Sequence, residues 1–240
     1  GLIGLGAMGA PMAWNLEAAG FELVVYNRTT DREQPFAEAG VAVADSPRHL
    51  TERADVVCLV VSDGDAVADV LERDRGVLDG LDSETTVVQM STIGYAETMA
   101  AAELVRDAGA RFVDAPVSGT VGPAEDGTLV GLAGGEEAVV ESVRPVLSAM
   151  CEPVVHCGDV GQGTAMKLFV NLLLGDAMAA FAEALVFGRA NGLDPDAMGT
   201  VVENGALSCP LFSIKGENIA DGDFASRFPV DYQFKDLSLA

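Results

Sequence analysis

A glycine-rich turn near the first residue constrains this chain more than any other feature. The pattern Gly4-x-Gly6-x-x-Gly9 follows a short apolar segment and opens a helical one. The first glycine of such a pattern permits a tight turn, the second lets the backbone approach a pyrophosphate, and the third lets the helix pack closely on the strand. The phosphates then lie against the free N–H groups of the helix start. The pattern predicts a dinucleotide site formed by Gly4, Leu5, Gly6, Ala7, Met8 and Gly9.

The first 160 residues alternate short β-branched runs with helical patterns. This alternation predicts an α/β fold of the Rossmann type, a doubly wound parallel sheet with helices on both faces. We expect strands at Gly1–Leu5, Leu23–Tyr26, Val56–Val61, Thr85–Gln89, Arg111–Asp114 and Leu129–Ala133. We expect helices near Pro11–Ala19, Gln34–Ala39, Ala66–Leu71, Ala96–Ala108 and Ala138–Met150.

The pattern changes near residue 160, where a long segment from Gly163 to Asn191 is apolar on nearly every face. A helix of this kind is buried on all sides. A membrane span is the weaker interpretation, since Asp176 and Glu183 would each cost about 3 kcal/mol near a bilayer centre. We expect an NADP-binding domain at 1–160 and an all-α substrate and oligomerisation domain at 161–240. Further helices are predicted near Pro195–Glu203 and Leu211–Ile219.

The charge of the chain excludes several classes of partner. It has 37 acidic and 14 basic residues, a formal net charge of −23. Such a surface repels nucleic acid and anionic lipid. It indicates adaptation to high salt, where screening weakens self-repulsion; an ordinary acidic protein is the alternative. The four cysteines form no CxxC pair, which predicts neither a metal site nor a disulfide framework. Without a signal-peptide pattern, we expect a cytoplasmic protein.

The end of the second expected strand bears on the choice of cofactor. It reads Tyr26-Asn27-Arg28-Thr29, where an NAD site usually places an acid that accepts from the ribose 2′-hydroxyl. Asn27 leaves room for a phosphate, and the planar guanidinium of Arg28 could bind it. The alternative is that Arg28 is a solvated surface residue. The segment favours NADP over NAD, with contacts from Asn27, Arg28 and Thr29.

A lysine in the long apolar helix is the best candidate for proton transfer. Lys167 and Asn171 are four residues apart, so both project from one face of the helix. An unpaired buried ammonium is costly, and burial lowers a lysine pKa towards the range useful in acid–base catalysis. The alternative is a lysine near the helix start whose ammonium reaches solvent. The loop at Ser118, Gly119 and Thr120 follows a strand, where it could hold a substrate carboxylate.

Four segments together resemble the β-hydroxyacid dehydrogenase family, which includes 3-hydroxyisobutyrate dehydrogenase, tartronate semialdehyde reductase and glyoxylate/succinic semialdehyde reductases. They are Gly4-Leu5-Gly6-Ala7-Met8-Gly9, Asp114-Ala115-Pro116-Val117-Ser118-Gly119, Gly161-x-Gly163-x-x-x-Lys167-x-x-x-Asn171 and Lys235-Asp236-Leu237. The resemblance runs in order through the whole chain. Family members reach further at the C-terminus, so we expect the chain to lack their final helices.

The resemblance implies hydride transfer between NAD(P) and a small 3-hydroxy acid or aldehyde acid. It implies that Lys167 is the general acid–base, that Asn171, Ser118 and Gly119 join it in catalysis, and that the assembly is a homo-oligomer. Substrate contacts are implied for Ser118, Gly119, Thr120, Lys167, Asn171 and Asp236. Cofactor contacts are implied for Thr92 and Lys235, and are expected also for Val60 and Val61. A helix cap is a compatible role for Thr92.

Two departures from the family pattern leave the substrate open: Thr120 stands where a second glycine is usual, and Val170 where many members have asparagine. Three alternatives also remain. An imine reductase usually replaces the lysine with aspartate or tyrosine. A 6-phosphogluconate dehydrogenase-like enzyme would have histidine at the position of Val170. A non-catalytic dinucleotide-binding module would have lost the lysine, and only the site can decide among them.

Overall fold

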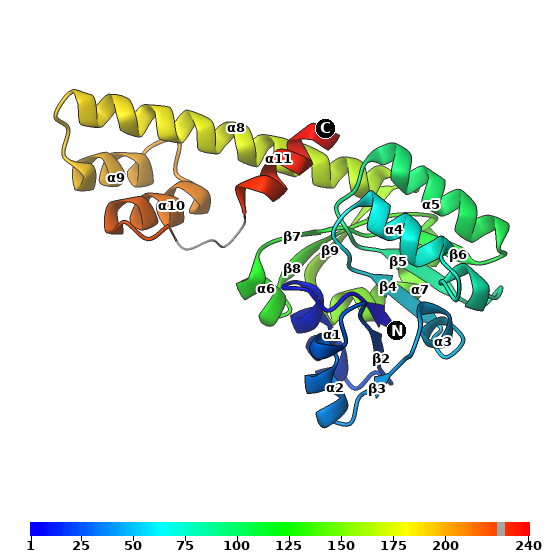
Figure 1. Cartoon of the computed structure of the whole chain (residues 1–240). Helices are drawn as coiled ribbons and strands as arrows, with labels where there is room; N and C mark the ends of the chain where they lie inside the picture. Colours follow the sequence, from blue (N-terminus) through cyan, green and yellow to red (C-terminus); the bar gives the residue numbers. More distant parts are fainter. Residues whose placement is uncertain (225–228) are drawn as a thin grey trace. The chain divides into compact units, whose positions relative to one another are not determined.

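The computed structural model describes residues 1–224 and 229–240. It contains one mixed sheet followed by helices (Figure 1). Five neighbouring strand pairs, from β3 to β6, are parallel, in the order β3-β2-β1-β4-β5-β6. The strands are β1 Leu2–Ile3, β2 Val24–Tyr26, β3 Ala42–Val43, β4 Val56–Leu59, β5 Thr86–Gln89, β6 Arg111–Asp114, β7 Val117–Ser118, β8 Leu129–Gly134 and β9 Cys151–Gly158.

The strand order confirms the predicted Rossmann-type fold. After β1 the chain moves outward to β2 and β3, then returns to β4 on the other side of β1. The carboxyl ends of β1 and β4 therefore flank the point where the strand order reverses, which is where ligands bind in open α/β sheets. Gly4 and Val60 directly follow these two strands.

The far side of the sheet departs from the all-parallel arrangement that the sequence predicts. Strand β8 runs antiparallel to β6 at Asp114 and Gly134, and β7 runs antiparallel to β8. Only β9 pairs with β8 in parallel. The connection between β6 and β8 is short and contains no long crossover helix, and a parallel crossover requires one. The sheet is mostly parallel but mixed.

Helices cover both faces of the sheet, and alternation along the strands supplies the two cores. In β1, Leu2 joins the core beneath α1 (Gly9–Ala18) and α7 (Glu137–Ser148), whereas Ile3 joins the core beneath α4 (Gly64–Glu72) and α5 (Tyr95–Asp107). Both side chains are at most 1% exposed. Strands buried on both faces read as continuous apolar runs, which is why the sequence pattern located them.

The remaining helices include predicted and unpredicted ones. The predicted helices α2 (Gln34–Glu38), α8 (Gln162–Ala190), α9 (Pro195–Asn204) and α10 (Pro210–Asp221) form close to their expected bounds. The structure adds α3 (Pro47–Thr51), α6 (Val121–Glu125), α11 (Val230–Leu239) and the 3-10 turns η1 (Thr30–Arg32) and η2 (Leu78–Gly80).

The chain divides into two compact units. The first unit contains 1–169 and 239–240, and the second contains 170–238. Helix α8 contributes to both, because its first eight residues belong to the first unit and the rest to the second. Lys167 therefore lies in the first unit, and Asn171 in the second.

Helix α8 forms as predicted, but the described part of this single chain does not bury it on all sides. Among the described residues it is long and apolar enough to cross a membrane by length and composition, with a mean hydropathy of 1.6. Only 11% of its most apolar stretch is buried. Phe169, Leu173 and Phe187 are 60% or more exposed. An apolar helix indicates that burial is required without indicating which surface provides it.

Candidate active site

The glycine-rich turn adopts the geometry that its sequence predicts. Gly4 has a φ of +102°, and a Cβ placed there would lie 2.1 Å from the carbonyl oxygen of Val60. A Cβ on Gly9 would lie 1.9 Å from the carbonyl oxygen of Gly4. Side chains are excluded at both positions, so the turn packs tightly against β4 and leads directly into α1. The first turn of α1 carries no acidic residue, which leaves its N–H groups suited to a pyrophosphate.

Asn27 has a structural role that the sequence did not reveal. Its Oδ1 accepts a hydrogen bond from the Leu5 N–H at 2.9 Å, and its Nδ2 donates to the Thr29 carbonyl at 2.8 Å. The Asn27 N–H donates to Oε1 of Glu33, a buried carboxylate, at 2.6 Å. Asn27 thereby connects the glycine-rich turn to the end of β2. It positions the exposed Arg28 and Thr29 immediately beyond that strand.

A second arginine near the turn was missed by the sequence analysis. Arg32 lies in η1, and its Nη1 donates to the Leu5 carbonyl at 3.4 Å. A Cβ on Gly6 would lie 3.6 Å from the same nitrogen. The guanidinium therefore lies beside the turn. Its spacing of four residues from Arg28 was the available signal, since both follow one strand end.

The ends of β4 and β5 meet near the same edge of the sheet. Val60 and Val61 follow β4, and the Val61 N–H donates to the Ser91 hydroxyl at 2.9 Å. Thr92 comes next and is half-buried. The prediction that Thr92 caps α5 is wrong, because Gly94 occupies the capping position. The Gly94 N–H donates to Oε2 of Glu97 at 2.6 Å.

The expected substrate loop is held by a short strand. Val117 and Ser118 form β7, which pairs with Gly131 and Val130 of β8. Gly119 follows with a φ of +141°, a conformation that favours glycine. Ser118 is half-buried, whereas Gly119 and Thr120 are exposed. These three residues offer hydroxyl and N–H groups suited to a carboxylate, and their role as a substrate loop stays a prediction.

Lys167 lies near the start of α8 and is 9% exposed. Of the described Lys and Arg side chains it alone is buried. Thr164 precedes it by one helical turn on the same face and is 2% exposed. The Thr164 hydroxyl forms a hydrogen bond of 2.9 Å with the hydroxyl of Thr98 on α5. The first unit therefore encloses the beginning of α8 on this face.

Asp114, at the end of β6, has a role that the sequence analysis did not assign. Its side chain is fully buried, and its two oxygens accept hydrogen bonds from the N–H groups of Gly161 and Thr164, each at 2.7 Å. Burial raises the pKa of this carboxyl above its usual range, while the two hydrogen bonds act in the opposite direction. Gly161 and Thr164 lie 47 and 50 positions after Asp114 in the sequence, and no local motif connects residues that far apart.

In the second unit, residues far apart in sequence form one polar cluster. Asn171 is 3% exposed, and its Nδ2 donates to Oδ2 of Asp236 at 2.6 Å. Gln233 Nε2 donates to the Asn171 carbonyl at 2.9 Å. The other Asp236 oxygen, Oδ1, forms an ion pair of 3.1 Å with Nζ of Lys235. The structure brings together three predicted site residues, Asn171, Lys235 and Asp236, and shows that Asp236 orients the Asn171 amide.

Across residues 1–224 and 229–240, no group of three or more His, Cys, Asp or Glu side chains could hold an ion. The fold and the geometry of the turn around Gly4 define the class of protein as one that binds a dinucleotide.

Comparisons with known proteins identify the family. Residues 1–158 match the family described as the NAD binding domain of 6-phosphogluconate dehydrogenase. Residues 161–240 match the NAD-binding domain of NADP-dependent 3-hydroxyisobutyrate dehydrogenase. The chain belongs to the β-hydroxyacid dehydrogenases, the family of 3-hydroxyisobutyrate dehydrogenase and glyoxylate/succinic semialdehyde reductase, and is an NAD(P)-dependent oxidoreductase. The second match also identifies α8 as a helix of this enzyme domain.

Individual relatives support this family assignment. The chain is 37% identical to glyoxylate/succinic semialdehyde reductase 2, chloroplastic, of Arabidopsis thaliana, over all of this chain and 67% of that protein. It is 33% identical to mouse mitochondrial 3-hydroxyisobutyrate dehydrogenase, over all of this chain and 74% of that protein. The structure of Mycobacterium tuberculosis 3-hydroxyisobutyrate dehydrogenase with L-serine superposes with a TM-score of 0.91 at 30% identity, covering 99% of this chain and 83% of the other. The predicted resemblance is confirmed.

Proposed function

We propose that this enzyme transfers a hydride reversibly between NADP and a small 3-hydroxy acid or the corresponding aldehyde acid, with Lys167 as the proton-transfer residue. The observation that carries the proposal is the burial of Lys167, which is 9% exposed while every other described Lys and Arg side chain is at least partly accessible. A buried amine near a cofactor domain has a reason to be there if it exchanges a proton with substrate.

In oxidation the substrate carbon loses a hydride and its hydroxyl loses a proton. A dinucleotide held at the turn around Gly4 would supply the hydride acceptor. The neutral amine of Lys167 accepts the hydroxyl proton, and in reduction the ammonium returns it to the carbonyl oxygen. Ser118, Gly119 and Thr120 hold the carboxylate through hydroxyl and N–H donors.

We assign Asn171, Asp236 and Lys235, all in the second unit, to the same proposed reaction. The hydrogen bond to Asp236 fixes the orientation of the Asn171 amide, which suits a group that orients the reacting oxygen. Asp236 lies near substrate in this proposal, and Lys235 contacts the cofactor. The Lys235–Asp236 ion pair supports placing both at one site.

NADP is the proposed preferred cofactor, and NAD the secondary one. The glycine positions of the turn leave no space for side chains, which suits close approach of a pyrophosphate. Arg28 is exposed just beyond β2, and Arg32 lies beside the turn, so two guanidinium groups are available to a 2′-phosphate. Glu33, a buried carboxylate near this strand end, accepts a hydrogen bond from the Asn27 N–H.

We further propose that the enzyme is a homo-oligomer that works at high salt. Residues 161–240 serve as the substrate and oligomerisation domain, and residues 1–160 bind the cofactor. The exposed apolar side chains of α8 support a homo-oligomer. The net charge of −23 supports an enzyme that works at high salt and binds neither nucleic acid nor membranes, and a cytoplasmic location stays a prediction.

A substrate screen tests the proposed reaction. Small 3-hydroxy acids would be offered with NADP+ or NAD+, and glyoxylate and succinic semialdehyde with NADPH or NADH, in low and molar salt. We expect turnover of at least one of these acids, with a higher kcat/KM for the NADP pair. Tight cofactor binding without turnover of any of them would contradict the proposal and favour a non-catalytic dinucleotide-binding module.

A further inference from the structure

We propose that Asp114 is a positioning residue for Lys167, which it holds in place through the first turn of α8, with Thr98 as a second anchor. The inference rests on the proposed function of Lys167. It concerns residues of the first unit only, and it gives a role to a buried carboxylate that touches neither substrate nor cofactor in the proposed reaction.

The start of α8 has no cap of its own. The residue before the helix is Gly161, which has no side chain to accept from the free N–H groups of the first turn. Asp114 supplies both acceptors from β6, taking the N–H of Gly161 on Oδ1 and that of Thr164 on Oδ2. A two-point attachment fixes the position of the turn along the helix axis and its rotation about it.

The same turn is pressed closely against the sheet. A Cβ on Gly163 would lie 2.2 Å from the Leu132 carbonyl oxygen and 2.6 Å from that of Asp114. A Cβ on Gly134 would lie 2.6 Å from Oδ1 of Asp114. The carboxylate and the turn therefore have no room to shift. Asp114 is fully buried, so water cannot replace it as an acceptor.

Thr164 transmits this fixed position to the lysine. It receives the Asp114 hydrogen bond on its N–H, and its hydroxyl contacts the hydroxyl of Thr98 at 2.9 Å. Lys167 lies three residues later on the same face, within the next turn of the helix. Displacing the first turn would displace the Lys167 amine, and a 1 Å misplacement of a reacting group can cost about 10²-fold in rate.

A double-mutant cycle tests the proposal on the full chain with whichever acid the wild type turns over. Asp114→Asn keeps one acceptor and turns an amide N–H towards a backbone N–H. We expect kcat to fall about 10- to 100-fold, while the substrate KM and the cofactor Kd change by less than about threefold. In the Lys167→Ala background, Asp114→Asn should lower the residual kcat by less than about twofold, because its effect acts through the lysine.

A purely structural role for Asp114 would give a different result. The two losses in kcat would then multiply, or KM and Kd would rise together with the fall in kcat, and either result overturns the proposal. The control is Ser46→Ala, which removes the cap of α3, where Ser46 accepts from the His49 N–H at 3.2 Å. Its kcat should stay within about twofold of wild type, since this cap lies on an element with no proposed role in the site.

Thr98→Val keeps the test decisive if Asp114→Asn does not fold. This variant preserves shape and removes only the hydroxyl contact to Thr164. We expect kcat to fall several-fold in the wild-type background, and we expect this fall to be absent in the Lys167→Ala background. An unchanged kcat in the wild-type background would overturn the proposal. If Lys167→Ala itself keeps more than about a tenth of the wild-type kcat, the proposed function fails, whatever Asp114 does.

Discussion

The two units of this chain differ in how far their apolar side chains are buried. In the first unit Leu2, Val57 and Leu59 are completely buried. In the second, Val201 and Leu207 are 71% and 69% exposed. The charge differs too: the first unit contains 27 acids and 10 bases, a net −17, and the second contains 10 acids and 4 bases, a net −6. The first unit encloses its own core and presents carboxylates, whereas the second presents apolar surface.

This difference follows from architecture. A sheet with helices on both faces closes two cores by itself, as the alternation of Leu2 and Ile3 between them shows. The second unit buries little more than contacts such as the stacked rings of Phe181 and Phe212, 4.6 Å apart. Its helices have apolar faces without a second layer among the described residues. Apolar content therefore indicates that burial is required, while topology decides whether one chain can supply it.

The largest expected effect comes from matched truncations in the two units. Leu59→Ala leaves a cavity in a closed core and should cost about 2–5 kcal/mol of unfolding free energy at any protein concentration. Leu207→Ala should cost about 0.5 kcal/mol or less in dilute solution, because the side chain is already exposed. Urea unfolding at several concentrations measures both. Equal losses in dilute protein would show that the contrast between the units is wrong.

A cofactor switch places nucleotide discrimination in the first unit. Asn27→Asp with Arg28→Val should lower the kcat/KM ratio of NADP to NAD by at least about tenfold, since a charged hydrogen bond to the 2′-phosphate is lost and a repelling carboxylate is gained. The aspartate can still accept from the Leu5 N–H. Initial rates with both cofactors give the ratio. A wild type that already prefers NAD would refute this assignment.

The exposed face of α8 should affect assembly more than folding. Phe187 is 69% exposed, and Phe187→Asp should weaken self-association about tenfold by removing apolar area from the interface. The control is Phe21→Asp, a change of an exposed aromatic residue in the first unit. Light scattering at molar salt compares the two variants. An unchanged mass for Phe187→Asp would mean that this face is not an interface.

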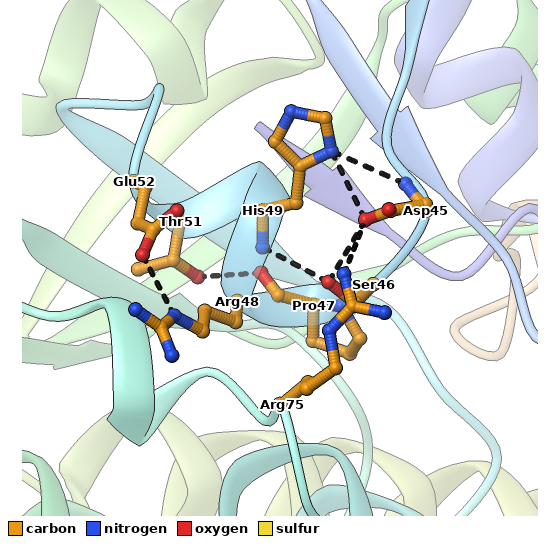
Figure 2. A network of polar contacts seen from close by, with 8 residues as sticks. All are labelled: Asp45, Ser46, Pro47, Arg48, His49, Thr51, Glu52 and Arg75. Atoms are coloured by element: carbon orange, nitrogen blue, oxygen red, sulfur yellow. Dashed lines mark hydrogen bonds and ion pairs between the residues drawn. The ribbon is translucent and has the colours of Figure 1, made fainter.

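The smallest expected effect lies on the surface of the first unit, in the network around Asp45 (Figure 2). Arg75 donates to Asp45 Oδ1 at 2.9 Å and lowers the pKa of that carboxyl below its usual value of 3.8. A lowered acid pKa stabilises the fold above the unfolded-state value, and this gain is lost as the pH falls through the folded-state value. Asp45→Asn should lower Tm slightly at pH 7 and not below the folded-state pKa, with kcat unchanged. A Tm difference that persists in acid would contradict this origin.

Much of the first unit could be predicted because its signals are local. The β-branched run Thr85–Val88 located β5 almost to the residue, and short apolar segments alternating with helical ones located β6. The glycine spacing located the turn. The missed strands lack such runs. Strand β3 has only two residues, and β9 interrupts its apolar positions with Glu152, Pro153 and His156.

The candidate site could be predicted as a set of residues but not as a set of contacts. Lys167, Asn171 and Ser118 came from spacing and family resemblance. Asp114 accepts a hydrogen bond from Thr164 at the start of α8, 50 positions away, and Asn171 donates one to Asp236, 65 positions away. Such pairings depend on how the elements pack, and no local pattern encodes them. Resemblance identified Asp236 without indicating its partner.

The most direct test of the account is the steady-state kcat of Lys167→Ala, measured beside Lys215→Ala. Lys215 lies in α10 and has no proposed role, so its variant should keep the wild-type kcat. Lys167→Ala should lose about 10²–10⁴-fold in kcat, the usual contribution of a general acid–base, with cofactor Kd within a few-fold of wild type. More than about a tenth of the wild-type kcat in Lys167→Ala would show that proton transfer lies elsewhere.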